Sequence, residues 1–298
     1  MIEKKAYAKI NLSLDVLGKL ENGYHEVCMI MQTIGLCDEL SFDVYNISPG
    51  EERIHLSCFF EDGGEAPTEN VKDNLVYKAA MLMLPYMPAD KGVDIKVVKH
   101  IPMAAGMAGG STDAAAALKG INELFRLGLT DGKLCELGVK IGADVPYCIM
   151  GGTMVAEGIG EKLSPIKSAA GINLVIAKPE EGVSTKYVYE ALDALDNPAH
   201  PDVKGMIRAI EDSSVEGIAS KLGNILEEVT IPVCPKVKKI KDILLENGAL
   251  GALMSGSGPT VFGIFETKEK AVIAADILRK LQTPVAKDIF VTTTWDDV

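Results

Sequence analysis

Residues 102–113 read Pro102-Met103-Ala104-Ala105-Gly106-Met107-Ala108-Gly109-Gly110-Ser111-Thr112-Asp113, a run of small residues between two apolar segments. Small residues let backbone N–H groups approach an anion closely, and a helix after them adds its N-terminal dipole and unpaired N–H groups. The hydroxyls of Ser111 and Thr112 can donate to the anion or ligate Mg²⁺, and Lys99 and His100 just upstream add positive charge. The stretch indicates a phosphate-binding loop.

The flanking segments place this loop between a strand and a helix. Residues 93–98 are typical of a strand, and apolar residues recur at helical spacing over 114–127. The glycines fit neither the P-loop pattern nor a usable dinucleotide-binding fingerprint. A tight turn capped by Ser111, Thr112 or Asp113 accounts for the glycines about equally well. The helix that follows directly favours phosphate binding.

The segment from Ala6 to Gly18 alternates between apolar and polar residues. This period of two predicts a half-buried strand that presents Lys9 and Asn11 on its polar face. A lysine there is either part of a solvated face or a cation that stabilises developing alkoxide charge. The sequence leaves both interpretations open.

Asp144 follows Gly142 and precedes Val145-Pro146. An aspartate in this position is a good helix N-cap, which is the favoured interpretation from the residue pattern alone. Transfer of a phosphoryl group to an alcohol requires positioning, charge neutralisation and often a carboxylate for the hydroxyl proton. Asp144 is therefore also a candidate base.

Two weaker signals lie elsewhere in the chain. Residues 254–260, which contain Gly256 and Gly258, form either a hairpin turn or a second backbone-lined loop against the phosphate site. Tyr24-His25 follows an Asn-Gly turn, and an aromatic ring with a histidine can stack on a nucleobase and read its edge. Most such pairs are structural, so the pair alone indicates little.

Composition excludes several classes of protein. The 298 residues suit two domains, and 47% hydrophobic with 24% charged residues is a globular composition. A net charge of −12 argues against nucleic acid and anionic membranes as partners. No signal core follows the start, no uncharged apolar run reaches the ~18 residues that span a bilayer, and the six cysteines show no CxxC spacing. We therefore expect a cytoplasmic protein with unpaired thiols and no metal cluster.

Together these pieces resemble the GHMP kinase superfamily. Its three motifs appear here in order: a strand with a lysine, Ala6-Tyr-Ala-Lys-Ile-Asn-Leu; a loop similar to Pro-x-x-x-Gly-Leu-Gly-Gly-Gly-Ser-Ser-Asp; and the late turn Ser255-Gly-Ser-Gly-Pro-Thr260. Further cues are similar to one branch, which phosphorylates a cytidyl alcohol in non-mevalonate isoprenoid precursor synthesis. They are Asn22-Gly-Tyr-His-Glu26, Gly142-Ala-Asp-Val-Pro146 and Gly158-Ile-Gly-Glu161.

The resemblance implies an α+β fold of two domains. Residues 1–160 would form an ATP-binding domain like domain 2 of ribosomal protein S5, and residues 161–298 a ferredoxin-like domain. It also implies MgATP as co-substrate and a small cytidyl compound as phosphate acceptor. Other GHMP kinases, of the mevalonate or homoserine class, and a non-catalytic ligand-binding member of the fold remain as alternatives.

Residue roles follow from the same resemblance. Lys9 and Asp144 match the catalytic pair. Asn11, Tyr24 and His25, with Tyr187 or Tyr189 as a second aromatic face, match positions that hold the cytidyl substrate. ATP contacts are expected from Asn74, Pro102, Met103, Ala104, Ala105, Gly106, Met107, Ala108, Gly109, Gly110, Ser111 and Thr112.

The chain departs from the family loop at Met107, Ala108 and Thr112, which replace Leu, Gly and Ser. Thr112 keeps the hydroxyl. Ala108 is the departure with a physical consequence, since a Cβ at a position of positive φ costs roughly 1 kcal/mol or more. We expect a similar backbone with altered ATP affinity.

Overall fold

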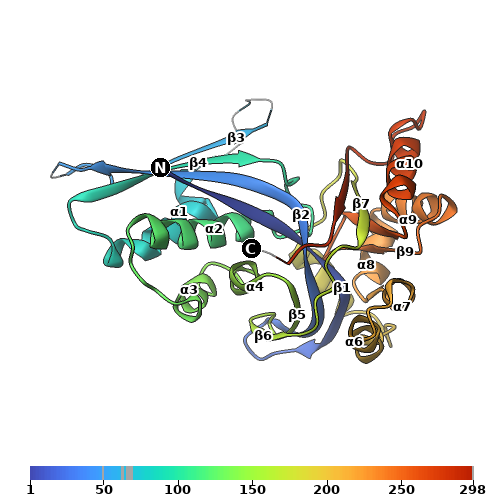
Figure 1. The fold of residues 1–298 in the computed structure, drawn as a ribbon. Coiled ribbons are helices and arrows are strands. Elements are labelled where there is room, and N and C mark those ends of the chain that lie inside the picture. The colour runs from blue at the N-terminus through green and yellow to red at the C-terminus, as the bar shows by residue number, and fades with distance from the viewer. Residues whose placement is uncertain (49, 62–63, 65–69, 297–298) are drawn as a thin grey trace.

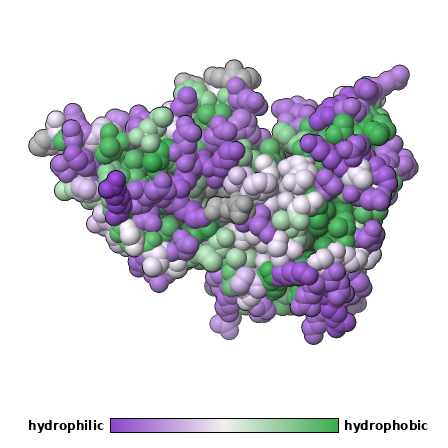
Figure 2. Space-filling view, in the orientation of Figure 1, coloured by the Kyte–Doolittle hydropathy of each residue, from purple (hydrophilic) through white to green (hydrophobic). Residues whose placement is uncertain are grey.

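The computed structural model describes residues 1–48, 50–61, 64 and 70–296. Figure 1 shows two lobes: a long twisted sheet with helices under one face, and a smaller sheet covered by helices of the second half of the chain. The predicted α+β fold is confirmed. Figure 2 shows hydrophilic side chains over most of the visible surface, as expected for a chain of net charge −12.

The larger sheet is mostly antiparallel. Within the described residues its strands run in the order β3-β4-β2-β1-β8, and β5 pairs with both β2 and β6. The pairs β3–β4 and β1–β8 are the parallel ones. Its strands are β1 (Ile2–Lys19), β2 (His25–Asn46), β3 (Ile54–Phe60), β4 (Lys91–Lys99), β5 (Thr153–Gly158), β6 (Lys162–Pro165) and β8 (Gly223–Asn224).

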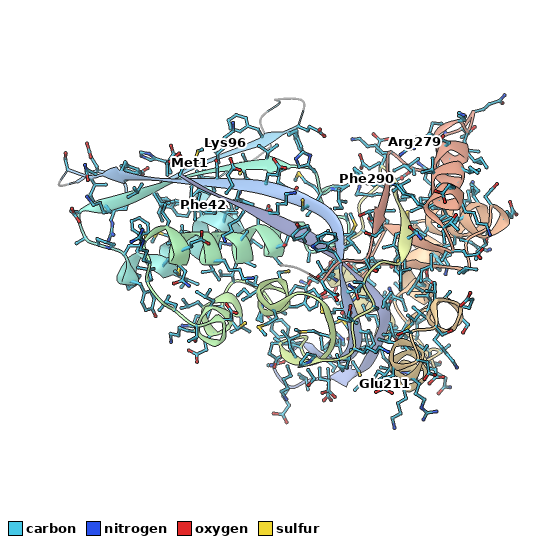
Figure 3. All side chains as sticks on the ribbon, viewed as in Figure 1. Met1, Phe42, Lys96, Glu211, Arg279 and Phe290 are labelled. Atoms are coloured by element: carbon cyan, nitrogen blue, oxygen red, sulfur yellow. The ribbon has the colours of Figure 1, made fainter. Side chains whose placement is uncertain are left out.

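Four α-helices of the first half lie under this sheet (Figure 1). They are α1 (Leu75–Met83), α2 (Gly109–Leu124), α3 (Asp131–Gly138) and α4 (Val145–Met150), with 3₁₀ turns at Val71–Asp73 and Leu84–Tyr86. The buried ring of Phe42, labelled in Figure 3, sits 2.6 Å from where a Cβ on Gly120 would lie. The glycine thus lets α2 approach β2 closely, which fixes the helix that begins at the glycine loop.

The strand predicted over Ala6–Gly18 is confirmed as part of β1, but the half-buried expectation is wrong. Ala8, Ile10 and Leu12 belong to a second apolar cluster, which they share with residues of the smaller sheet. The opposite side chains, Lys9 and Asn11 among them, are buried as well. Both faces are covered because residues of the second lobe pack on one face of β1, and α2 and α4 of the first lobe contact the strand as well.

The smaller sheet has the antiparallel order β11-β7-β10-β9. Numbered within this lobe, that order is 4-1-3-2, which fits the predicted ferredoxin-like domain. Its strands are β7 (Asn173–Lys178), β9 (Gly251–Met254), β10 (Val261–Phe265) and β11 (Asp288–Thr293). Its helices are α5 (Thr185–Leu192), α6 (Val203–Glu211), α7 (Val215–Ser220), α8 (Glu227–Val233), α9 (Lys236–Glu246) and α10 (Lys268–Arg279).

Two segments of the second half return to the first sheet. The short strand β8 pairs with β1 at Ser13 and Leu14. After β11, Thr294 bridges to Ile34, and the Trp295 N–H donates to the Thr33 carbonyl at 2.8 Å. The domain boundary near residue 160 stays a prediction, and segments beyond it complete the first sheet.

Candidate active site

A cavity of about 1120 Å³ opens between the two lobes. Its walls come from β1, β2, α5 and the loops that precede α2 and β10. The predicted site residues that line it are Lys9, Tyr24, His25, Asn74, Pro102, Met103, Ala104, Ala105, Gly106, Ala108, Gly109, Gly110, Ser111, Asp144 and Tyr189. Most of the predicted site is thus brought together in one cavity.

Four predicted residues do not line the cavity: Asn11, Met107, Thr112 and Tyr187. Met107 is buried in the core, and its carbonyl accepts the Lys9 N–H at 3.2 Å. The Thr112 hydroxyl donates to the Tyr7 carbonyl at 2.7 Å, so Ser111 is the hydroxyl that faces the cavity. Tyr187 is 48% exposed on α5, and Tyr189 is the tyrosine that reaches the cavity.

The glycine loop is shorter than the sequence predicted, because α2 begins at Gly109 rather than near 114. Ala108 occupies the N-cap position with φ 58°, and no side chain caps the helix. The alternative interpretation, a turn capped by Ser111, Thr112 or Asp113, is therefore wrong. A left-handed residue breaks the chain direction just before the helix, which leaves first-turn N–H groups open to the cavity. The first turn of α2 therefore has no side-chain cap and borders the cavity.

Lys9 and Asp144 face each other across the cavity wall. The Lys9 Nζ lies 3.9 Å from the Asp144 Oδ2 and donates to the Asn11 Oδ1 at 2.7 Å. Asp144 stands at the N-cap position of α4, but its side chain makes no capping hydrogen bond. The capping interpretation is thus wrong, and the carboxylate is directed to the cavity. Asn11 is fully buried behind the lysine, where it orients the ammonium group.

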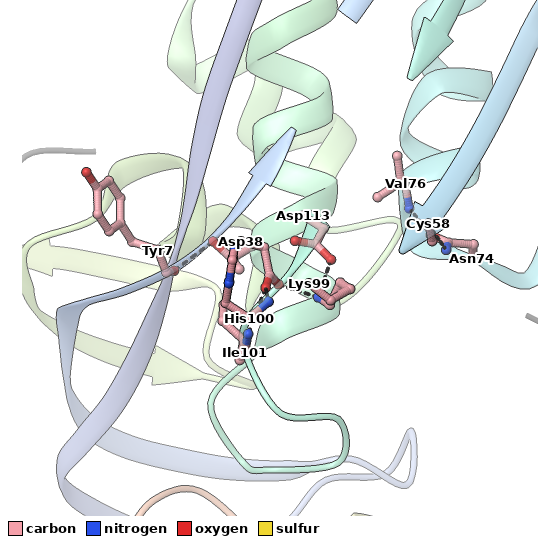
Figure 4. A network of polar contacts seen from close by, with 10 residues as sticks. Tyr7, Asp38, Cys58, Asn74, Val76, Lys99, His100, Ile101 and Asp113 are labelled. Carbon is pink, nitrogen blue, oxygen red and sulfur yellow. Dashed lines mark hydrogen bonds and ion pairs between the residues drawn. The ribbon is translucent and has the colours of Figure 1, made fainter. Parts of the chain in front are cut away.

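Lys99 does not supply the free positive charge expected from the sequence. Its Nζ contacts the Asp38 carboxylate and lies 2.5 Å from the Asp113 Oδ2, as Figure 4 shows. Asp38 also accepts the backbone N–H groups of His100 and Ile101. Burial raises the pKa of Asp113 to about 8. One lysine therefore serves two buried carboxylates.

The His100 ring does not line the cavity. Its Nδ1 lies 3.3 Å from the exposed carboxylate of Glu61. Besides Lys99, the lysines that line the cavity are Lys9, Lys19 and Lys186, and the start of α2 adds its dipole.

His25 is held by side chains that the sequence did not reveal. Its Nε2 lies 2.7 Å from the Asp193 Oδ1, and the other Asp193 oxygen accepts from Lys19 at 2.6 Å. The hydrogen bond from Lys19 lowers the pKa of Asp193 most, and that from His25 lowers it further. The imidazole also packs on the Tyr189 ring, with 4.9 Å between ring centroids. The carboxylate fixes the Nε2–H and leaves Nδ1 as the second polar atom of the ring.

Tyr24 and Asn74 stand at two further points of the wall. Tyr24 is 59% exposed, so one face of its ring is available to a ligand. The Asn74 side chain caps α1 by accepting the Val76 N–H at 2.8 Å, and its amide lies 3.5 Å from the Cys58 sulfur (Figure 4). Asn74 thus places the start of α1 next to the glycine loop.

The late glycine turn joins β9 to β10 and packs directly on the phosphate loop. The Ser255 hydroxyl donates to the Gly106 carbonyl at 2.9 Å, and a Cβ on Gly106 would lie 2.2 Å from the Ser255 carbonyl oxygen. Gly256 and Ser257 line the cavity. Both sequence interpretations hold: the segment is a hairpin turn and also a second loop against the phosphate site.

In the described part of the chain, no three His, Cys, Asp or Glu side chains gather as a metal site. The described cysteines are all unpaired thiols. None of the described helices has the length and apolar run that a membrane crossing requires.

Two family models match the chain. The model described as GHMP kinases N terminal domain covers residues 74–152, and that described as GHMP kinases C terminal covers residues 204–282. Relatives in Lachnospira eligens and Caldicellulosiruptor bescii are each 49% identical, over 99% and 97% of this chain and 98% and 97% of their own lengths. Both carry the name 4-diphosphocytidyl-2-C-methyl-D-erythritol kinase.

Solved structures give the same result. A crystal structure of 4-(cytidine 5′-diphospho)-2C-methyl-D-erythritol kinase superposes with a TM-score of 0.80 at 31% identity, covering 98% of this chain and 99% of its own. A mevalonate kinase of L. major superposes with a TM-score of 0.77 at 18% identity, over 99% of this chain and 96% of its own. The second match indicates a shared fold only.

Proposed function

Because the chain belongs to the GHMP kinase family, we propose that it transfers the γ-phosphoryl group of ATP to the 2-hydroxyl of 4-diphosphocytidyl-2-C-methyl-D-erythritol. The reaction is a step of non-mevalonate isoprenoid precursor synthesis, and we assign it to the cytoplasm. The name shared by relatives 49% identical over nearly the whole chain supports this acceptor. The cavity, with an anion site at one end and a histidine–tyrosine pair at the other, supports it independently.

The phosphate groups of ATP bind at the first turn of α2. Its uncapped N–H groups and helix dipole favour the negative charge of the β- and γ-phosphates. Ser111 is the residue that would hold Mg²⁺, since its hydroxyl lines the cavity while that of Thr112 is used by Tyr7. The ion would neutralise phosphate charge there. Asn74, at the start of α1 beside the loop, marks the adenosine side.

Asp144 is the base for the acceptor hydroxyl. As the hydroxyl oxygen bonds to the γ-phosphorus and the bond to the leaving ADP oxygen breaks, the hydroxyl proton passes to the Asp144 carboxylate. The Lys9 ammonium, 3.9 Å from that carboxylate and fixed by Asn11, stabilises the developing negative charge on the acceptor oxygen. This pair is the single observation that carries a catalytic rather than a merely binding function.

The cytidyl group lies at the end formed by Tyr24, His25 and Tyr189. The exposed Tyr24 ring supplies an aromatic face, while His25, held by Asp193, meets the polar edge of the base. Mevalonate and homoserine carry no base, so neither would use an aromatic face and a histidine at this end of the cavity. The remaining alternative, a non-catalytic member of the fold, is disfavoured by the paired Lys9 and Asp144.

Product formation tests the proposal. We expect ADP from MgATP with the cytidyl alcohol, and none with mevalonate or homoserine. No ADP with the cytidyl alcohol would overturn the assignment of the acceptor, and no ADP with any of the three would support the non-catalytic alternative.

Asp144→Asn tests the base in the same assay. The variant should bind MgATP like the wild type, while kcat falls about 10²- to 10⁴-fold because the amide cannot take the proton. Nearly intact turnover would reduce Asp144 to a structural residue of α4.

A further inference from the structure

The Asn224 side chain makes three hydrogen bonds, all of them to backbone groups. Its Nδ2 donates to the carbonyls of Met254 and Gly256, both at 2.8 Å, and its Oδ1 accepts the Leu226 N–H at 3.0 Å. Asn224 is 7% exposed. A buried amide whose two N–H groups hold two carbonyls of one turn fixes the path of that turn.

Two side chains at three-residue intervals hold the same turn. The Glu227 Oε1 accepts the Met254 N–H at 2.9 Å, and its other oxygen pairs with Lys241 at 2.5 Å. The Thr230 hydroxyl donates to the Ser257 carbonyl at 3.3 Å. Residues 224, 227 and 230 therefore form a cradle for the turn 254–260, which we call the cradle below.

The turn in the cradle is the one that touches the phosphate loop. Besides the bond from the Ser255 hydroxyl to Gly106, a Cβ on Gly256 would lie 2.9 Å from the Gly106 carbonyl oxygen. Contacts this close between two backbones allow no side chain between them. A displacement of the turn must therefore displace Gly106.

The cradle is also anchored to the strand that carries the catalytic lysine. Asn224 pairs with Leu14 in the β8–β1 ladder, and the Ile225 N–H donates to the Leu14 carbonyl at 3.1 Å. Farther along β1, the Lys9 N–H bonds the Met107 carbonyl of the phosphate loop. The contacts thus run from β1 to the cradle, from the cradle to the turn 254–260, and from the turn to the phosphate loop. The phosphate loop in turn bonds β1.

We propose that Asn224 is a positioning residue for phosphoryl transfer, which sets the phosphate loop relative to Lys9 through the turn 254–260. Asn224 does not line the cavity. The inference rests on the proposed kinase function for its kinetic consequences, but its effect on nucleotide binding can be measured without turnover.

Asn224→Asp tests the proposal, because the carboxylate keeps the acceptor for Leu226 and loses both donors to Met254 and Gly256. We expect the Kd for MgATP, measured by calorimetry, and the KM for ATP to rise about 10-fold or more. The KM for the cytidyl alcohol should change less than about twofold, since that end of the cavity is built from other segments.

Asn122→Asp is the matched control. Asn122 holds Leu129 by the same kind of bonds, Nδ2 to the carbonyl at 2.9 Å and Oδ1 from the N–H at 3.0 Å, near the far end of α2. It should lower the Tm without changing the Kd for MgATP. Equal losses of Tm with an unchanged Kd in both variants would overturn the proposal, because Asn224 would then be only structural.

Ser255→Ala removes the next link, the bond to Gly106, and should raise the Kd for MgATP in the same direction. In the double variant with Asn224→Asp the two effects should be less than additive, since both act through one contact. If the effects of the two substitutions on the Kd are fully additive, Asn224 and Ser255 do not act through the same contact with Gly106, and the proposal is contradicted. If Asn224→Asp does not fold, an unchanged Kd in Ser255→Ala overturns the proposal. Wild-type protein that binds MgATP but yields no ADP would refute the kinase function instead.

Discussion

The two ends of the cavity differ in the groups that line them, which are mainly backbone at one end and side chains at the other. At the end where we propose that phosphate binds, the groups available to a ligand are the backbone N–H groups of the uncapped start of α2. The loop before that helix is held by close contacts between the backbones at Gly106 and Ser255. At the other end the groups are side chains, with His25 oriented by Asp193 and packed on Tyr189. The backbone end is sensitive to added volume, whereas the side-chain end is sensitive to charge and hydrogen bonding.

Gly106→Ala gives the largest expected effect. The new Cβ would meet the Ser255 carbonyl at 2.2 Å, and φ at this residue is +68°. Because neither backbone can yield without moving the loop, we expect kcat/KM for ATP to fall about 10²-fold. The KM for the cytidyl alcohol should stay within twofold. Steady-state kinetics with each substrate varied measures both, and equal losses for the two substrates would contradict the separation of the two ends.

Asp193→Asn breaks the side-chain end alone. The amide can no longer fix the Nε2–H of His25 by charge, so we expect kcat/KM for the cytidyl alcohol to fall about 10-fold, mostly through KM. The Kd for MgATP should not change. Asp202→Asn is the matched control, because Asp202 likewise pairs with a lysine, Lys221 at 2.6 Å, but does not line the cavity; its kinetic constants should equal those of the wild type. A change in nucleotide affinity in Asp193→Asn would show that the two ends are coupled.

Asp113→Asn probes a titratable group behind the backbone end. The folded pKa of about 8 lies above the ordinary value of 3.8, so the folded state binds a proton that the unfolded state has lost between these values. This contribution to stability is complete below the lower pKa and is lost as pH rises through the upper one. Urea unfolding from acidic to mildly alkaline pH should show a shallower decline in the free energy of unfolding for the variant. An unchanged slope would mean that Asp113 is ionised in the folded protein.

Ala108→Gly gives the smallest expected effect. A Cβ on a left-handed residue costs about 1 kcal/mol of stability, and the substitution removes that cost. Glycine also raises the conformational entropy of the unfolded chain, which lowers the stability by a few tenths to about 1 kcal/mol. We expect the free energy of unfolding to rise by 0 to about 1 kcal/mol in urea titration. Because Ala108 already adopts the left-handed φ of 58°, we now expect the Kd for MgATP to stay nearly unchanged, in contrast to the altered affinity expected from the sequence. A loss of stability would show that the Cβ contributes packing that outweighs the strain.

The difference between the two ends of the cavity also explains which parts of the site could be predicted from the sequence. The backbone end follows from local composition, and the order strand, loop, helix was correct, as was the partner loop at Ser255. The start of α2 was misplaced because Gly109 and Gly110 are poor helix formers held helical by their surroundings. Asp193 could not be found, since it lies 168 residues from His25 in a segment without a motif. Asp38 and Asn224 were missed for the same reason, because each acts on backbone that only the folded chain brings near.

The segment after β11 contacts the first sheet, and this contact has a consequence for how the protein folds. Thr294 pairs with Ile34, and Trp295 bonds the backbone at Thr33 and stacks on Tyr7 with 6.0 Å between ring centroids. Each of these contacts joins residues that are 260 positions or more apart in the sequence. The strands of the first sheet are therefore fully paired only after β8 and the segment that follows β11 have joined it. Contacts of such high sequence separation make folding slow, because the entropy of closing a long loop is lost before the contacts form.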